Sequence, residues 1–250
     1  PDGRFKLAQL VRANRELERV CRAYRLPCVS GKDSMKNDYG TGEHKISIPP
    51  TLLFSLFGDH PDVRKSATSD FKFAGDKIYL VGSSKQELGA SELAYMMVES
   101  GRAAGIGGQV PQLPHPEQNL ATYRALSTSI RAGWVRTAHD CSEGGLAVAL
   151  AEMCIGGRIG AAVDIDGSGE GDVWGRLWGE SLGRFVVAVS PQHEAAFLAA
   201  MKGHPTTVLG EVVADNNLTI TDGDDALVSL DVDTMTTVWK GTLDLTGGVV

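Results

Sequence analysis

The sequence predicts an α/β fold in which helices and strands form mixed layers. Short apolar segments with strand character alternate along the chain with longer segments of helical spacing, and this alternation is typical of layered α/β architectures. The 250 residues include 42% hydrophobic and 22% charged side chains, which is enough for a sizeable core. Glycine is unusually frequent at 30 residues, which predicts many tight turns of the kind that often hold phosphates.

Charge and hydropathy exclude several classes of protein. Lysine and arginine number 24 against 31 aspartates and glutamates, so the net charge of −7 argues against a nucleic-acid partner. Apolar runs such as 146–155, broken by Glu152, fall short of the ~20 residues of a membrane span, so we expect no membrane association.

The cysteines and the start of the chain give two further expectations. The four cysteines do not have the spacing of metal ligands, and no secretory segment precedes them. We therefore expect reduced thiols in a cytoplasmic protein. These cysteines are Cys21, Cys28, Cys141 and Cys154. The chain begins at Pro1 without a methionine, so we expect a piece of a longer polypeptide.

The first part of the chain begins with a predicted helix. Apolar residues recur at helical spacing over 5–24, and Pro27 ends the element. A polar loop over 31–38 follows. A strand or strand pair is predicted over 46–57, and its Pro49-Pro50 step places it at a sheet edge or a bulge.

The polar stretch 58–75 is the best domain boundary, and we divide the chain into residues 1–70 and 71–250. After the boundary, alternating periodicity predicts a series of strands and helices. The predicted strands are 77–81, a short one into His139, 161–165, 184–189, 207–213, 218–220 and 226–232. The predicted helices are 91–98, 120–134, 143–155 and 192–201.

The strongest local signal for chemistry is a strand end, a glycine turn and a helix start over 137–153. Ser142 is predicted to cap the helix, with Glu143 in its first turn. Backbone N–H groups at such a helix start bind phosphate, and the Asp140 carboxylate is suited to hold Mg²⁺ against the same phosphate. The structural alternative is that Ser142 only caps the helix and Asp140 only accepts turn hydrogen bonds.

Cys141 beside His139 raises the alternative of a nucleophile and its base. No orienting third group is evident, and the glycine-flanked elbow that exposes a nucleophile is absent. We therefore predict that Cys141 is a small turn residue and that the chain carries no catalytic nucleophile of its own.

Two further polar segments are candidates for chemistry. The loop with Lys32, Asp33 and Ser34 is not a P-loop, because Leu26 stands where the first glycine is needed. Its cation, carboxylate and hydroxyl nevertheless suit a phosphorylated ligand or a metal–nucleotide. A solvated loop is the alternative. Glu180, Ser181 and Arg184 precede an apolar strand, and we expect Arg184 to pair with Glu180 structurally.

The segments together resemble a known family. Gly31-Lys32-Asp33-Ser34-Met35, His139-Asp140-x-Ser142-x-Gly144-Gly145-Leu146 and Glu180-Ser181-x-x-Arg184-Phe185 stand in the order found in formylglycinamide ribonucleotide amidotransferases (phosphoribosylformylglycinamidine synthases). The chain is similar to the second of the two synthetase-like halves of that family. The resemblance implies an aminoimidazole ribonucleotide synthetase-like C-terminal domain, preceded by the end of an N-terminal α/β domain.

The resemblance also implies an activity. The family consists of ATP-dependent carbon–nitrogen ligases of purine biosynthesis, which convert formylglycinamide ribonucleotide to formylglycinamidine ribonucleotide. ATP and Mg²⁺ are the implied cofactors. The implied partners are the remaining synthase domains and a glutaminase domain or subunit that supplies ammonia from glutamine.

Site residues follow from matching motif positions only. Asp140 matches a position that binds Mg²⁺, and Ser142 matches a position that contacts an auxiliary nucleotide. Gly31 matches a glycine that contacts ATP, and Ser34 matches a serine that contacts substrate. Lys32 replaces the metal-binding asparagine of single-subunit relatives, which leaves Asp33 as an alternative metal ligand.

The chain has no counterpart of the first half's catalytic histidine segment and no glutaminase Cys-His-Glu set, so we expect it to be inactive alone. Two alternatives stay open. One is a non-catalytic, nucleotide-holding structural module. The other is a different ATP-using relative, such as a selenophosphate synthetase or a thiamine-monophosphate kinase.

Overall fold

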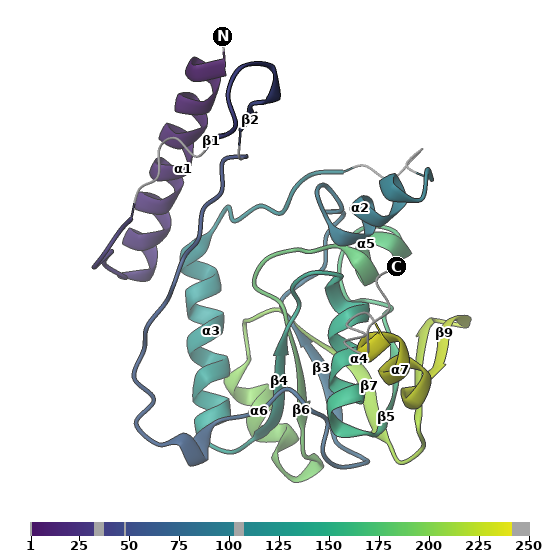
Figure 1. Cartoon of the computed structure of the whole chain (residues 1–250). Helices are drawn as coiled ribbons and strands as arrows, with labels where there is room; N and C mark the ends of the chain where they lie inside the picture. The colour runs from purple at the N-terminus through teal and green to yellow at the C-terminus, as the bar shows by residue number, and fades with distance from the viewer. Residues whose placement is uncertain (1, 33–37, 48, 103–107, 242–250) are drawn as a thin grey trace. The chain divides into compact units, whose positions relative to one another are not determined.

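The computed structural model describes residues 2–32, 38–47, 49–102 and 108–241 (Figure 1). The chain divides into two compact units, residues 1–61 and residues 62–250. The division falls inside the polar stretch 58–75 that separates the two kinds of sequence pattern. Each unit is described by itself below.

Residues 1–61 contain one long helix and a small strand pair. The elements are α1 (Asp2–Tyr24), β1 (Asp38–Tyr39), a 3₁₀ turn (Gly42–His44) and β2 (Ile46–Ser47). Helix α1 agrees with the helix predicted over 5–24, and the two strands pair antiparallel.

The longer strand predicted over 46–57 is largely wrong. Of the residues that the structure describes in this range, only Ile46–Ser47 is strand, and residues 49–60 form no regular element. Pro49 and Pro50 have no N–H to donate to a sheet ladder. The apolar side chains beyond them are exposed, including Leu53 and Phe57, so hydrophobicity alone did not produce a buried strand here.

Residues 62–250 are built around a seven-stranded sheet with the order β4-β6-β3-β7-β5-β8-β9. Neighbouring strands run antiparallel except β5 and β8, which are parallel. This mixed α/β architecture confirms the predicted fold class. The strands are β3 (Lys77–Val81), β4 (Val135–Asp140), β5 (Gly160–Asp164), β6 (Phe185–Val189), β7 (Thr206–Val213), β8 (Asn217–Asp222) and β9 (Asp225–Asp231).

Helices cover both faces of this sheet. In Figure 1, α3 and α6 lie on one side of it and α4 and α7 on the other. Two of the helices, α5 and α7, were not predicted from the sequence. The helices are α2 (Glu92–Glu99), α3 (Pro116–Arg131), α4 (Gly145–Gly157), α5 (Val173–Trp178), α6 (Glu194–Ala200) and α7 (Val232–Gly241), with 3₁₀ turns at Val63–Lys65 and Pro191–His193.

The sheet has a hydrophobic core on each face because its central strands are apolar on both sides. Along β3, Ile78 and Leu80 join the larger core, which includes α4, whereas Tyr79 and Val81 join the smaller core with α3 and α6. Strand β6 divides its side chains in the same way. Successive side chains of a strand point to opposite faces, so a continuous apolar run predicts a strand covered on both sides.

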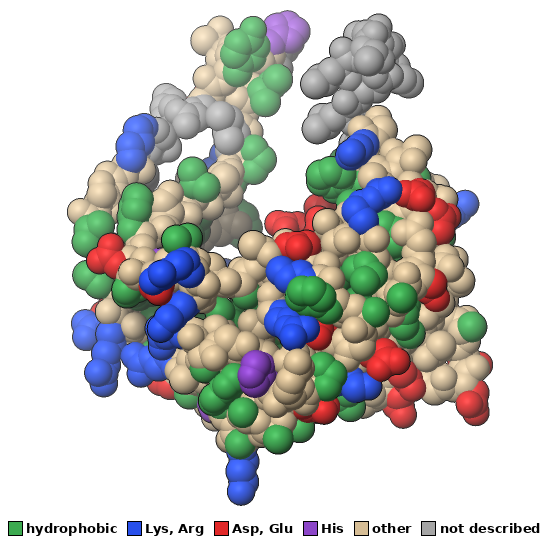
Figure 2. Space-filling view, turned by 90° about the horizontal axis from the view of Figure 1, so that it is seen from below, with side chains coloured by type: hydrophobic (Ala, Val, Ile, Leu, Met, Phe, Trp, Pro, Cys, Tyr) green, Lys and Arg blue, Asp and Glu red, His purple; other side chains and the backbone are tan. Residues whose placement is uncertain are grey.

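The surface carries charges of both signs. On the face shown in Figure 2, basic and acidic side chains are both present among polar and apolar ones. Among the described residues, none of the helices combines the length and apolar character needed to cross a bilayer.

Adjacent glycines at the end of α4 give a test of the packing. A Cβ atom on Gly157 would lie 2.1 Å from the carbonyl oxygen of Phe71, whereas one on Gly156 would lie 3.2 Å from the Cβ of Asp70. We expect Gly157→Ala to lower the free energy of unfolding by about 1–3 kcal/mol through overpacking. Gly156→Ala is the control and should change it by less than about 1 kcal/mol. Equal midpoints of thermal unfolding for the two variants would contradict this packing.

Candidate functional site

Pairing of β4 with β6 brings two of the sequence signals together. Asp140, at the end of β4, stands opposite Phe185 at the start of β6. The next residue, Cys141, donates its N–H to the carbonyl of Arg184 at 3.0 Å. The turn 140–144 and the loop 179–184 are therefore neighbours, although they are far apart in the sequence.

A cleft of about 560 Å³ opens between these two loops. Three carboxylates, Asp140, Glu143 and Glu180, contribute to its lining, together with the Ser142 hydroxyl. The other lining residues come from the 140–144 turn, from residues 182–185, from α3 and from the segment before α3: Pro111, Tyr123, Cys141, Leu182, Gly183, Arg184 and Phe185.

Ser142 does not cap α4, and the prediction that it does is wrong. The helix begins at Gly145 with Gly144 as its N-cap. Both glycines have positive φ, 76° and 66°, a conformation that other residues adopt at a cost, so the chain turns later than the capping pattern suggests. The Ser142 hydroxyl instead donates to the Asp140 carboxylate at 2.6 Å. This bond brings the two matched motif residues together at the mouth of the cleft.

Glu180 supplies the missing cap. One of its carboxylate oxygens accepts the N–H of Gly144 and the N–H of Glu92, both at 2.9 Å. Glu92 is the first residue of α2, so a single carboxylate serves the N-termini of two helices, where negative charge is stabilised. The sequence placed Glu180 in a polar segment but assigned it the wrong partner.

Arg184 does not form the expected ion pair with Glu180. Its guanidinium donates to the Ser84 hydroxyl at 2.8 Å, to the carbonyl of Ser181 at 3.1 Å and to the carbonyl of Gly179. The side chain is 1% exposed. This burial lowers the pKa of Arg184, and electrostatic interactions with Cys141, Glu87 and Glu180 oppose that shift.

The structure agrees with the prediction that Cys141 is not a nucleophile. The thiol is buried, and burial raises its pKa to about 11, whereas reactive cysteines have lowered values. His139 is engaged elsewhere. Its Nε2 lies 3.1 Å from a Glu152 carboxylate oxygen, and its Nδ1 lies 2.7 Å from the carbonyl oxygen of Asp140.

The Gly31 loop is only partly described. Gly31 and Lys32 are exposed residues of the first unit. Asp33 and Ser34, the alternative metal ligand and the predicted substrate contact, lie outside the described residues. Within the described ranges, no three His, Cys, Asp or Glu side chains are grouped closely enough to hold a metal ion.

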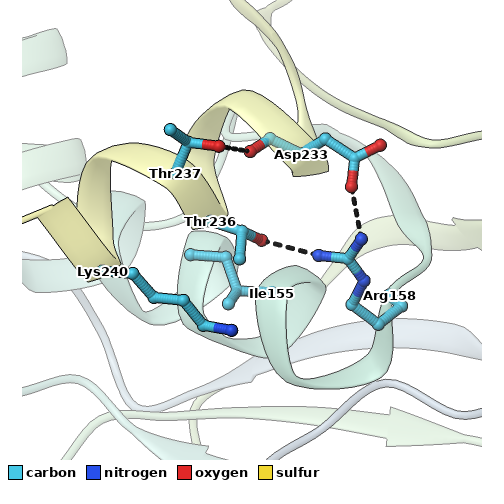
Figure 3. Close-up of a pocket in the computed structure, with 6 residues that line it drawn as sticks. All are labelled: Ile155, Arg158, Asp233, Thr236, Thr237 and Lys240. Carbon is cyan, nitrogen blue, oxygen red and sulfur yellow. Dashed lines mark hydrogen bonds and ion pairs between the residues drawn. The ribbon is translucent and has the colours of Figure 1, made fainter.

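A second, smaller hollow of about 460 Å³ lies between the end of α4 and α7 (Figure 3). Arg158 donates there to the Thr236 hydroxyl at 2.9 Å and pairs with Asp233, while Lys240 and Ile155 line the other side. The Arg158 guanidinium already links the end of α4 to α7 through these two contacts. We therefore interpret this hollow as a result of helix packing. None of the predicted site residues lies in it.

Comparison with known proteins defines the class. The family described as "AIR synthase related protein, C-terminal domain" matches residues 74–223. The chain therefore belongs to this family, which confirms the resemblance predicted from its motifs. The matched range begins before β3 and includes the two loops that form the cleft.

Individual relatives show which member of the family the chain is similar to. The chain is 35% identical over 248 residues to phosphoribosylformylglycinamidine synthase subunit PurL of Deinococcus radiodurans, covering 96% of this chain but only 32% of that protein. The chain thus spans about a third of the length of this curated relative. Structures of Thermotoga maritima PurL complexed with FGAR and with ATP share the fold, with TM-scores of 0.59 and 0.52 and identities of 20% and 19%. Each match covers 70% of this chain, and 30% and 28% of the respective PurL chains.

The double role of Glu180 can be tested by substitution. Glu180→Ala removes the acceptor of two backbone N–H groups, and a hydrogen bond to a charged group is worth about 1.5–3 kcal/mol. We expect a lower melting temperature and faster amide exchange at Gly144 and Glu92. Glu180→Gln, which keeps an acceptor oxygen, should restore part of the loss. Glu143→Ala is the control, since Glu143 is exposed in the same turn; equal effects of Glu143→Ala and Glu180→Ala would rule out the capping role.

Proposed function

We propose that this chain is part of a phosphoribosylformylglycinamidine synthase, an ATP- and glutamine-dependent carbon–nitrogen ligase of purine biosynthesis. The observation that carries the proposal is the 35% identity with a PurL subunit over 96% of the chain. Family membership and the order of the three motifs support it. Because the chain spans 32% of that relative, the activity is proposed for the larger protein and the isolated chain is expected to be inactive.

The cleft beside α4 is the proposed nucleotide site. Asp140 is proposed as a Mg²⁺ ligand and Ser142 as a contact to ATP or ADP. Mg²⁺ is commonly held by one or two carboxylates together with substrate phosphates and water, without an all-protein cage. An Asp140 side chain that is 64% exposed at the mouth of a cleft fits this kind of site. The Ser142 hydroxyl orients the carboxylate by its bond to one oxygen.

The remaining assignments follow from the same proposal. Gly31 would contact ATP, Ser34 would contact formylglycinamide ribonucleotide, and Asp33 stays an alternative metal ligand. The proposed partners are the other synthase domains and a glutaminase domain or subunit, in the cytoplasm. We also propose that residues 1–70 are the end of an N-terminal domain and that residues 71–250 form the C-terminal domain.

A non-catalytic, nucleotide-holding module is the second candidate. The observation that favours it is the Glu180 carboxylate, which already occupies the Gly144 N–H where a phosphate was expected. A stably held nucleotide at this cleft would then support the fold without turning over. Single-turnover labelling in the full-length protein separates the two, because only a reacting nucleotide loses its terminal phosphate when substrate is added.

The role of Asp140 can be tested by titrating ADP against the chain with and without Mg²⁺. We expect Mg²⁺ to strengthen binding and Asp140→Asn to weaken Mg²⁺-ADP binding roughly ten- to a hundredfold, the range expected for losing an interaction with a charged group. Glu117→Gln, an exposed carboxylate of α3, is the control and should bind as the parent does. Equal affinities in all of these titrations would remove Asp140 from the site.

The role of Ser34 can be tested in the full-length synthase. Ser34→Ala should reduce kcat/KM for formylglycinamide ribonucleotide about ten- to a hundredfold, because one hydrogen bond to a charged phosphate is lost. Glutaminase activity should stay unchanged, since that chemistry resides in another domain or subunit. The melting temperature should also stay unchanged, because Ser34 is proposed to contact substrate and not to support the fold. A well-folded Ser34→Ala enzyme with normal kcat/KM would return this loop to an ordinary surface role.

A further inference from the structure

Two cysteines in the first unit lie close together outside the proposed site. The Sγ atoms of Cys21 and Cys28 are 3.8 Å apart, and the two residues are seven positions apart in the sequence. A disulfide requires about 2.05 Å between the sulfurs. The gap can therefore close through a shift of under about 2 Å, within the reach of side-chain rotation at the half-buried Cys21 and the exposed Cys28.

The turn after α1 holds these thiols together. The N–H of Leu26 donates to the carbonyl of Cys21 at 3.0 Å, and the N–H of Arg25 donates to the carbonyl of Arg22 at 3.3 Å. Arg25 has φ 56°. This pair of bonds around a left-handed residue is the Schellman motif. It reverses the chain, so that Cys28, just beyond Pro27, returns to the last turn of the helix.

We propose that Cys21 and Cys28 are a reversible disulfide site that reacts with low-molecular-weight disulfides of the glutathione class. The exposed Cys28 thiolate attacks one sulfur of the small disulfide, which forms a mixed disulfide and releases one small thiol. Cys21 then attacks the Cys28 sulfur and releases the second small thiol. Two protein thiols are oxidised, one small disulfide is reduced, and the protons lost by the protein thiols go to the departing thiolates.

The other cysteines are placed differently. Cys141 and Cys154 are buried, and burial raises their pKa values to about 11 and about 12, so neither is a ready thiolate. The pKa of Cys21 is also raised, by desolvation and then by Cys28. This agrees with assigning the first attack to Cys28 and the closing step to Cys21.

The position of the pair gives the bond a consequence. The disulfide would tie the chain to α1 just ahead of Gly31, the first residue of the motif Gly31-Lys32-Asp33-Ser34-Met35. Cross-linking removes conformations from the segment that it closes. In the oxidised chain, Cys28 is therefore held at the end of α1, and the segment that begins at Gly31 starts from this restrained position. This holds whatever the function of that segment. Exposed disulfides are the easily reduced kind, so the bond is reversible under reducing conditions.

The test is equilibration of the full chain with mixtures of reduced and oxidised glutathione, followed by acid quenching, alkylation and tryptic mass spectrometry. Cleavage at Arg19, Arg22, Arg25 and Lys32 places the two cysteines in the separate peptides 20–22 and 26–32. We expect these peptides to appear joined. The peptide 137–158, which holds both buried cysteines, should remain fully alkylated and serves as an internal control.

Folding should favour the bond. We expect the equilibrium constant with glutathione to be at least about tenfold higher in the native chain than in urea, because the turn raises the effective concentration of the thiols. Arg25→Gly should keep the same equilibrium constant in the native chain, because glycine readily adopts the left-handed conformation of this position. Arg25→Val, with a β-branched side chain at positive φ, should lower it several-fold.

Three results would overturn the proposal. The first is separate glutathione adducts on Cys21 and Cys28 without a joined peptide. The second is a bond that forms only between two chains, detected by a doubled mass before digestion. The third is the same equilibrium constant in the native chain, in urea and in Arg25→Val. None of these results bears on the proposed ligase function, which the ADP titration tests separately.

Discussion

Burial of a single guanidinium organises the loops from which the candidate site is built. Arg184 is almost wholly removed from water, and its guanidinium donates to the Ser84 hydroxyl and to the carbonyls of Gly179 and Ser181. An uncompensated buried charge costs several kcal/mol, so these groups must converge. Their convergence fixes the segment that carries Glu180, and Glu180 in turn holds the N-termini of α2 and α4.

The central strands give this arrangement a rigid support. Strand β6 follows Arg184 directly and lies between β4 and β3, with an apolar core on each of its faces. Register between β4 and β6 sets Asp140 opposite Phe185, and a slip by one residue would exchange the faces of every side chain in the strand. Core packing therefore sets where the two loops meet, and the buried Arg184 sets the course of the 179–184 loop at that place.

Sequence patterns predicted most of the second unit and much less of the site. Apolar runs and helical spacing located the strands and most helices, because burial sets these periodicities. The six-residue α5 was missed because it is too short to show a periodicity. The C-terminal α7 was missed although Val232, Met235, Val238 and Trp239 recur at helical spacing. Ser142 was expected to cap α4, yet Glu180 does so from a distant segment. The residues near the start of α4 carry no sign of a cap that a distant segment contributes, so this contact could not be predicted from the sequence. For the same reason, the partners of Arg184 could not be predicted.

The carboxylates around the cleft have an electrostatic consequence. Asp140, Glu143 and Glu180 present negative charge to whatever enters between the loops, and the neighbouring guanidinium of Arg184 is committed to uncharged oxygens. A polyanion that approaches this rim is repelled by the three carboxylates, and a bound divalent cation weakens that repulsion by lowering the net charge of the anion. An anion that enters between the loops therefore meets less electrostatic repulsion when a divalent cation accompanies it, before any specific contact is made.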